Sequence, residues 1–121
     1  SFFKRRDIDG VLLQTGKFSS VAPDMLREIG DRVKERTGQP TVVVLVDVGE
    51  DESCKIVVMA DDDAVRRGAH AGNLVKEASA LLGGRGGGRP NTAQGGGRDA
   101  AKLNEALDRV EALLRTQLKA Q

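Results

Sequence analysis

The sequence predicts an α/β fold in which helices pack on a mixed β-sheet, and three observations support this fold class. Two neighbouring segments are continuously apolar and β-branched, a pattern typical of strands that are covered on both faces. Three other segments repeat apolar residues at the spacing of amphipathic helices. The segments follow the order β-α-β-β-α-α, and a glycine-rich stretch with room for a loop or short strand precedes the last helix. We therefore expect residues 1–121 to form a single globular domain.

The first half of the chain predicts a strand, a helix and a central hairpin. A short apolar run between turn-forming residues predicts a first strand at about 10–15. The next segment has apolar residues at helical spacing, with Pro23 near its start and Gly38 beyond its end, and so predicts a helix. An acidic turn separates the two β-branched segments, so we expect 42–48 and 56–60 to pair at the centre of the sheet.

The second half predicts two helices on either side of the glycine-rich stretch. Apolar residues at helical spacing predict a helix over 71–82, which ends at Gly83 because a left-handed C-terminal cap favours glycine. The segment 90–94 is long enough only for a short strand or an extended connection. Asp99 is a good N-cap for a final amphipathic helix, whose apolar positions run through 103–118.

Composition and charge limit the classes of function. Aromatic residues make up 2% of the chain, so Phe2, Phe3 and Phe18 are the only candidates for stacking on nucleic-acid bases. Residues 64–98 carry 6 Lys+Arg and 1 Asp+Glu, although the formal net charge of the whole chain is +1. Such a local concentration of positive charge can steer a polyanion. No apolar run approaches the roughly 20 residues of a membrane span, so we expect a cytoplasmic protein without a membrane segment.

Candidates for catalysis or metal binding are few. His70 is the only histidine and lies near a helix start, where a solvated or capping side chain is favoured over a catalytic one. The acidic triplet 61–63 lacks the ligand spacing of a calcium loop, so a solvated turn is favoured. Cys54 lies inside an apolar strand, which favours a buried structural thiol in a reducing compartment. We therefore predict neither catalytic residues nor a metal site.

The glycine-rich stretch 81–97 is the feature that most needs a functional explanation. It holds eight of the chain's 15 glycines and two arginines, and it has no acidic side chain. Its spacing matches neither nucleotide-binding glycine motif, and two interpretations stay open: a tight connection required by sterics, or an anion-binding concavity for phosphate formed by glycine N–H groups beside arginine side chains. The residues that we expect to contact a bound polyanion are Lys76, Arg85, Gly86, Gly87, Gly88, Arg89, Gln94 and Arg98.

The segment 81–107, LLGGRGGGRPNTAQGGGRDAAKLNEAL, resembles the signature GG-[KR]-GGGRP-x-x-AQ-GG of the C-terminal domain of alanyl-tRNA synthetases. This domain, often called C-Ala, is a member of the DHH-associated domain family, and the likeness extends upstream through the two β-branched segments. Related DHH-family phosphoesterases have a GGGH-type motif whose histidine helps to hold a substrate phosphate. Arg89 stands at that position here, which favours the synthetase branch.

The resemblance implies a tRNA-binding domain that performs no chemistry itself. It implies binding of tRNA(Ala) at the elbow and a link between the aminoacylation and editing activities of the synthetase. ATP, Mg²⁺ and Zn²⁺ would then belong to other domains of the same enzyme, and a preceding helical segment would support a homodimer. The alternatives are the accessory nucleic-acid-binding domain of a DHH-family phosphoesterase, another kind of nucleic-acid binder, and a structural or dimerisation module.

Overall fold

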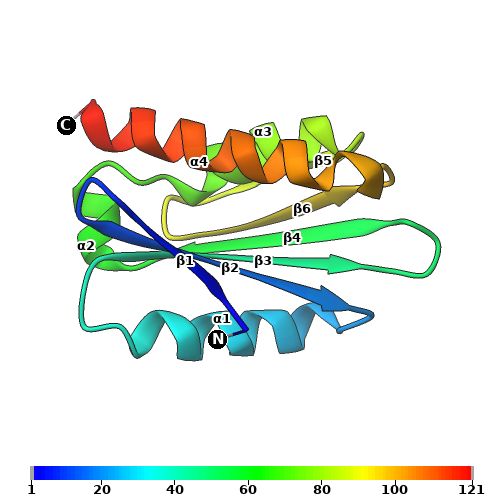
Figure 1. Cartoon of the computed structure of the whole chain (residues 1–121), viewed down its shortest axis with the longest axis horizontal. Coiled ribbons are helices and arrows are strands. Elements are labelled where there is room, and N and C mark those ends of the chain that lie inside the picture. Colours follow the sequence, from blue (N-terminus) through cyan, green and yellow to red (C-terminus); the bar gives the residue numbers. More distant parts are fainter. Residues whose placement is uncertain (1, 121) are drawn as a thin grey trace.

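The computed structural model describes residues 2–120 as a six-stranded mixed sheet with helices on both faces (Figure 1). The strands are β1 (Lys4–Ile8), β2 (Val11–Ser19), β3 (Thr41–Val48), β4 (Cys54–Ala60), β5 (Arg85–Gly88) and β6 (Thr92–Gly97). The helices are α1 (Pro23–Glu35), α2 (Asp62–Arg66), α3 (Ala71–Leu81) and α4 (Leu103–Lys119), with a 3-10 turn at Ala100–Lys102. This architecture confirms the predicted fold class.

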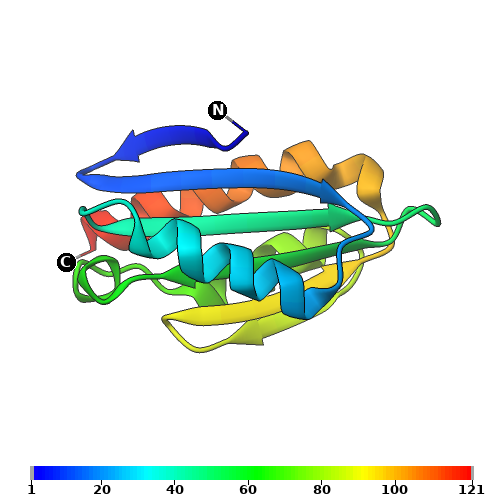
Figure 2. The ribbon, with the colours of Figure 1, turned by 90° about the horizontal axis from the view of Figure 1, so that it is seen from below.

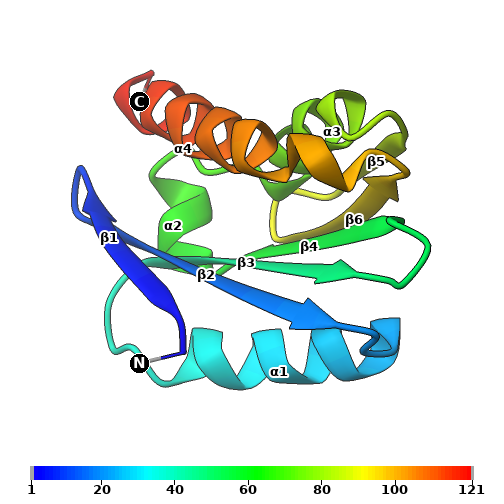
Figure 3. The same cartoon turned by 45° about the vertical axis from the view of Figure 1, so that its right-hand side comes forward.

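The strands lie in the order β1-β2-β3-β4-β6-β5. β2 and β3 pair in parallel, and the other neighbouring strands are antiparallel. Figure 3 shows α1 on one face of the sheet and α3 and α4 on the other. The expected central hairpin is confirmed, because β3 and β4 pair in register from Val42 with Ala60 to Val48 with Cys54.

β3 is apolar on both faces because it supplies two separate hydrophobic clusters. Val42, Val44 and Val46 face the cluster beneath α3 and α4, whereas Val43 and Leu45 face the cluster beneath α1. All five side chains are fully buried. The continuous β-branched run is therefore explained by helices that cover both sides of the strand.

The first strand is longer than predicted and is preceded by an unpredicted partner. β2 continues from Val11 to Ser19, and β1 pairs with it along the outer edge of the sheet. The turn between them is stabilised by the backbone N–H of Gly10, which donates to the Asp7 carboxylate at 3.0 Å. The sequence analysis did not predict β1, because four of its five residues are exposed and its sequence therefore has no apolar alternation.

The acidic triplet, predicted as a solvated turn, and the predicted N-cap of the last helix both differ in the structure. The acidic triplet forms the start of α2, where the Asp61 carboxylate accepts a bond from the backbone N–H of Ala64 at 2.8 Å. The prediction that Asp99 caps the last helix is wrong, because a 3-10 turn intervenes and its side chain makes no capping bond. The predicted left-handed end of α3 is confirmed by Gly83, whose φ is +76°.

Candidate nucleic-acid interface

The glycine-rich stretch is a β-hairpin, formed by β5 and β6, rather than an irregular loop. α3 packs directly on the backbone of this hairpin. A Cβ atom added to Gly86 would lie 2.6 Å from Val75 Cγ1 and 2.7 Å from Ser79 Oγ. A Cβ atom added to Gly95 would also collide with Ser79. The glycines on this face are therefore required by the close packing of α3.

The opposite face of the same hairpin has free space above it. Side chains alternate between the two faces of a strand, so the neighbours of Gly86 and Gly95 point away from α3. A Cβ atom added to Gly87 would have no other atom within 4 Å. Arg85 and Gln94 are exposed on this side. Figure 2 shows β5 and β6 extending past α1, which covers the middle of the sheet.

We call this surface the open face, and it extends across three strands. The register aligns Arg85 of β5 with Gly96 of β6 and then with Lys55 of β4. The next row aligns Gly87 with Gln94. Two cationic side chains therefore flank a floor that is largely bare backbone.

Helix α1 forms the border of the open face. Arg27 in its second turn donates a hydrogen bond from its guanidinium to the Gln94 Oε1 atom at 2.6 Å and also pairs with Asp24. A shallow pocket of about 270 Å³ lies at this border, and Lys55 and Leu26 are among its lining residues. Arg27 and Lys55 were missed by the sequence analysis, because only the strand register and the position of α1 bring them beside the hairpin.

The turn between β5 and β6 binds the N-terminal end of α3 through backbone hydrogen bonds. The carbonyl oxygens of Arg89 and Pro90 accept bonds from the backbone N–H groups of Gly72 and Ala71 at 3.0 Å and 2.8 Å. The His70 Nδ1 atom accepts from the N–H of Asn73 at 3.0 Å, which confirms a capping role for this histidine. These N–H groups are therefore already bonded within the protein and are not available to a phosphate.

The predicted contact residues do not form one cluster. The structure brings Arg85, Gly87 and Gln94 together on the open face, whereas it places Gly86 against α3. Gly88 is the last residue of β5, and a Cβ atom added there would collide with Ala93.

The remaining three candidates lie around the hairpin. Arg89 follows the distal end of β5, about 13 Å from Arg85 at a rise of about 3.3 Å per strand residue. Arg98 follows β6 at the other end of the hairpin, near Asp51. Hydrogen bonds from Ser53 lower the pKa of the Asp51 carboxyl, and the positive charge of Arg98 lowers it further. Lys76 is exposed on α3.

The lone thiol lies beneath this surface rather than on it. Cys54 is 2% exposed, as predicted, and burial raises the pKa of its thiol, with a smaller contribution from the Asp47 charge. Within residues 2–120, no group of three or more His, Cys, Asp or Glu side chains is gathered as metal ligands. None of the helices in the same described range is long and apolar enough to cross a membrane.

The chain belongs to the DHHA1 domain family, and the family match spans residues 11–116. Among solved structures, it is similar to the C-Ala domain of the Aquifex aeolicus alanyl-tRNA synthetase, with a TM-score of 0.82 and 28% sequence identity. That match covers 93% of this chain and 98% of the solved chain. The likeness to C-Ala domains expected from the glycine signature is therefore confirmed.

Curated relatives of the chain are alanine–tRNA ligases. It is 39% identical over 113 residues to alanine–tRNA ligase 1 of Lachnoclostridium phytofermentans, a match that covers 93% of this chain and 13% of the relative. It is 52% identical over 95 residues to the enzyme of Alkaliphilus oremlandii, covering 78% of this chain and 11% of the relative. The chain thus spans only about an eighth of the length of these enzymes.

Proposed function

We propose that this chain is a non-catalytic tRNA-binding domain of an alanine–tRNA ligase and that its open face binds the elbow of tRNA(Ala). The observation that carries the proposal is the bare backbone at Gly87, which lies one row from the cationic side chains of Arg85 and Lys55 on a surface without a covering helix. The similarity to a C-Ala domain and to alanine–tRNA ligases supports the same assignment.

The chemistry of the open face suits folded RNA. The elbow of a tRNA is a rigid, structured surface that proteins recognise mainly through shape, stacked bases and backbone. Glycine allows such a surface to approach the sheet without a side chain between them. Arg85 and Lys55 can pair with phosphates and release counterions, and Gln94 supplies an amide that donates and accepts hydrogen bonds.

Within a longer cytoplasmic ligase, this domain would hold one tRNA for both the aminoacylation and the editing sites. ATP, Mg²⁺ and Zn²⁺ would be bound by the other domains, and a helical segment outside these residues would support a homodimer. The small share of each relative that the chain spans is consistent with this division of labour.

The test is to compare Gly87→Val with wild type in tRNA(Ala) binding, measured by fluorescence anisotropy. We expect Gly87→Val to weaken binding at least tenfold while the melting temperature stays unchanged, because the added side chain enters free space over the open face. Ala80→Val is a matched control, since it adds an exposed apolar side chain on α3. Equal affinity of Gly87→Val and wild type would contradict the proposal.

A further inference from the structure

A second candidate site lies at the opposite edge of the sheet, between α4 and the β1–β2 hairpin. It is a groove of about 500 Å³, within the range of about 300–1,000 Å³ that is usual for ligand sites. Alternate residues of β1 and β2 line one side, and residues of α4 at helical spacing line the other. The lining residues are Phe2, Lys4, Arg6, Leu13, Thr15, Lys17, Asn104, Leu107, Asp108 and Glu111.

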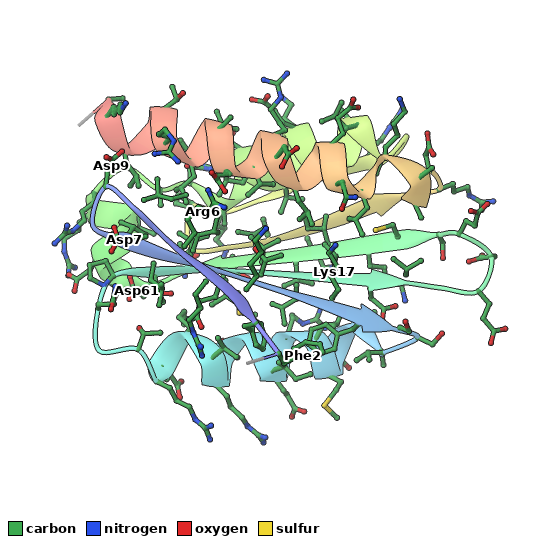
Figure 4. The ribbon with its side chains drawn as sticks, viewed as in Figure 1. Phe2, Arg6, Asp7, Asp9, Lys17 and Asp61 are labelled. Carbon is green, nitrogen blue, oxygen red and sulfur yellow. The ribbon has the colours of Figure 1, made fainter. Side chains whose placement is uncertain are left out.

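Two polar contacts join the walls of the groove. At one end the Lys17 Nζ atom lies 3.4 Å from the Asn104 Oδ1 atom, and at the other end the Arg6 guanidinium pairs with Glu111 at 3.4 Å. Figure 4 labels Arg6 and Lys17 on the strands that border the groove. The apolar side chains of Leu13 and Leu107 also line it.

The groove has an excess positive charge that the protein does not neutralise. Among the described residues, Lys4 and Asp108 have no ion-pair or hydrogen-bond partner, and Lys17 contacts only a neutral amide. With Arg6 and Glu111 paired to each other, the remaining three groups carry a net charge of +1. A ligand with a single negative charge, such as one phosphodiester, would complement them.

An aromatic ring is available at the same place. Phe2 is 64% exposed, yet its position is supported by ring contacts with Phe18 and Phe3 at centroid distances of 5.0 Å and 5.5 Å. A supported and exposed ring is suited to stacking on an unpaired base. The Asp108 carboxylate can accept a bond from an amino group on the edge of such a base.

We propose that this groove binds one unpaired nucleotide of an RNA. Its base stacks on Phe2 and its phosphate lies between Lys4 and Lys17. The proposal rests on the RNA-binding function proposed above, but the groove and the open face lie at opposite edges of the sheet and use different residues. The domain would then contact RNA at two places, one for folded RNA and one for an unpaired nucleotide.

The experiment titrates the 121-residue chain with fluorescein-labelled pentaadenylate and follows anisotropy at several salt concentrations. We expect Phe2→Ala to reduce affinity at least fivefold, and Phe2→Trp to retain it, because stacking accounts for the loss. Lys17→Ala should lower the salt slope by about 0.7, the value for one phosphate contact on a single strand. Lys119→Ala, an exposed lysine at the end of α4, is the matched control and should leave both quantities unchanged.

Several results would overturn the inference. These are the absence of pentaadenylate binding, wild-type affinity of both Phe2→Ala and Lys17→Ala in folded protein, and equal competition by inorganic phosphate and by AMP. Loss of pentaadenylate binding in Gly87→Val would also overturn it, because the oligonucleotide would then occupy the open face. If tRNA binding depends on Gly87 but pentaadenylate binding does not depend on Phe2 or Lys17, the proposed function stands and this inference falls.

Discussion

The β3–β4 hairpin and the β5–β6 hairpin lie next to each other in one sheet, but different groups stabilise them. Side chains fill both faces of β3 and β4, and thirteen of their fifteen residues are buried, whereas the second hairpin is packed mostly through its backbone. Burial of side chains suits stability, because apolar area is removed from water. Bare backbone suits contact with a large partner, because it leaves one face accessible.

Seven of the eight positions of β3 and six of the seven positions of β4 are buried. In β5 and β6, by contrast, Ala93 is the one buried position. The first hairpin is therefore expected to tolerate loss of side-chain volume poorly. The second is expected to tolerate gain of volume poorly on its α3 face and at Gly96, where an added Cβ atom would collide with the Cys54 backbone oxygen, but not at Gly87.

The largest expected effect is on the first hairpin. Leu45 is fully buried in the cluster beneath α1, so Leu45→Ala should lower the free energy of unfolding by about 2–5 kcal/mol. Urea denaturation measures this loss. The affinity of the folded fraction for tRNA(Ala) should remain that of wild type. A loss of stability below about 1 kcal/mol would show that the central hairpin does not depend on side-chain packing as described.

The next effect concerns the α3 face of the second hairpin. Gly86→Ala should destabilise the protein by about 1–3 kcal/mol, because the added Cβ atom would lie 2.6 Å from the Gly95 Cα atom and from Val75. Gly87→Ala is the matched control, since its Cβ atom meets no neighbour within 4 Å. Thermal unfolding of the two variants compares the faces directly, and equal melting temperatures would contradict the distinction between them.

The β3–β4 hairpin can be predicted from the sequence because its side chains show the pattern of strands that are buried on both faces. Val42 to Val46 are apolar at every position, and helices on both faces of the sheet are the physical reason. β5 could not be predicted in the same way, since glycine has low strand propensity and no side chain to show alternation. Its pairing with β6 and its packing on α3 determine its conformation.

The candidate site could be predicted only in part for a related reason. The glycine motif identified the correct segment, but sequence proximity could not show that Gly86 and Gly87 face opposite sides of the hairpin. Lys55 and Arg27 reach the open face from β4 and α1, and such contacts between distant segments depend on register. The count of charges along the chain also could not show that Arg85 and Arg89 lie at opposite ends of β5.

A smaller effect is expected for charge on the open face. Arg85→Ala should reduce affinity for tRNA(Ala) roughly five- to tenfold near 0.1 M salt and lower the salt slope by about 0.9, if its guanidinium contacts one phosphate. Arg32→Ala, an exposed arginine in the last turn of α1, is the control and should change neither. Titration across a range of salt gives both quantities. An unchanged salt slope for Arg85→Ala would show that the phosphate contacts lie outside the row formed by Arg85, Gly96 and Lys55.

The smallest effect should come from Ser79, which lies on the face of the β5–β6 hairpin that packs against α3 and not on the open face. Its hydroxyl is buried between α3 and the hairpin and has no hydrogen-bond partner among the described residues. Ser79→Ala removes this unsatisfied group and should stabilise the protein by up to about 1 kcal/mol, since an unpaired buried hydroxyl carries a desolvation cost. Because Ser79 lies on the α3 face, affinity for tRNA(Ala) should not change. Differential scanning calorimetry and the anisotropy titration measure the two quantities on the same protein. A weaker affinity in a variant that is equally or more stable would show that the α3 face also contributes to RNA binding, and the division between a packed face and a binding face would then be wrong.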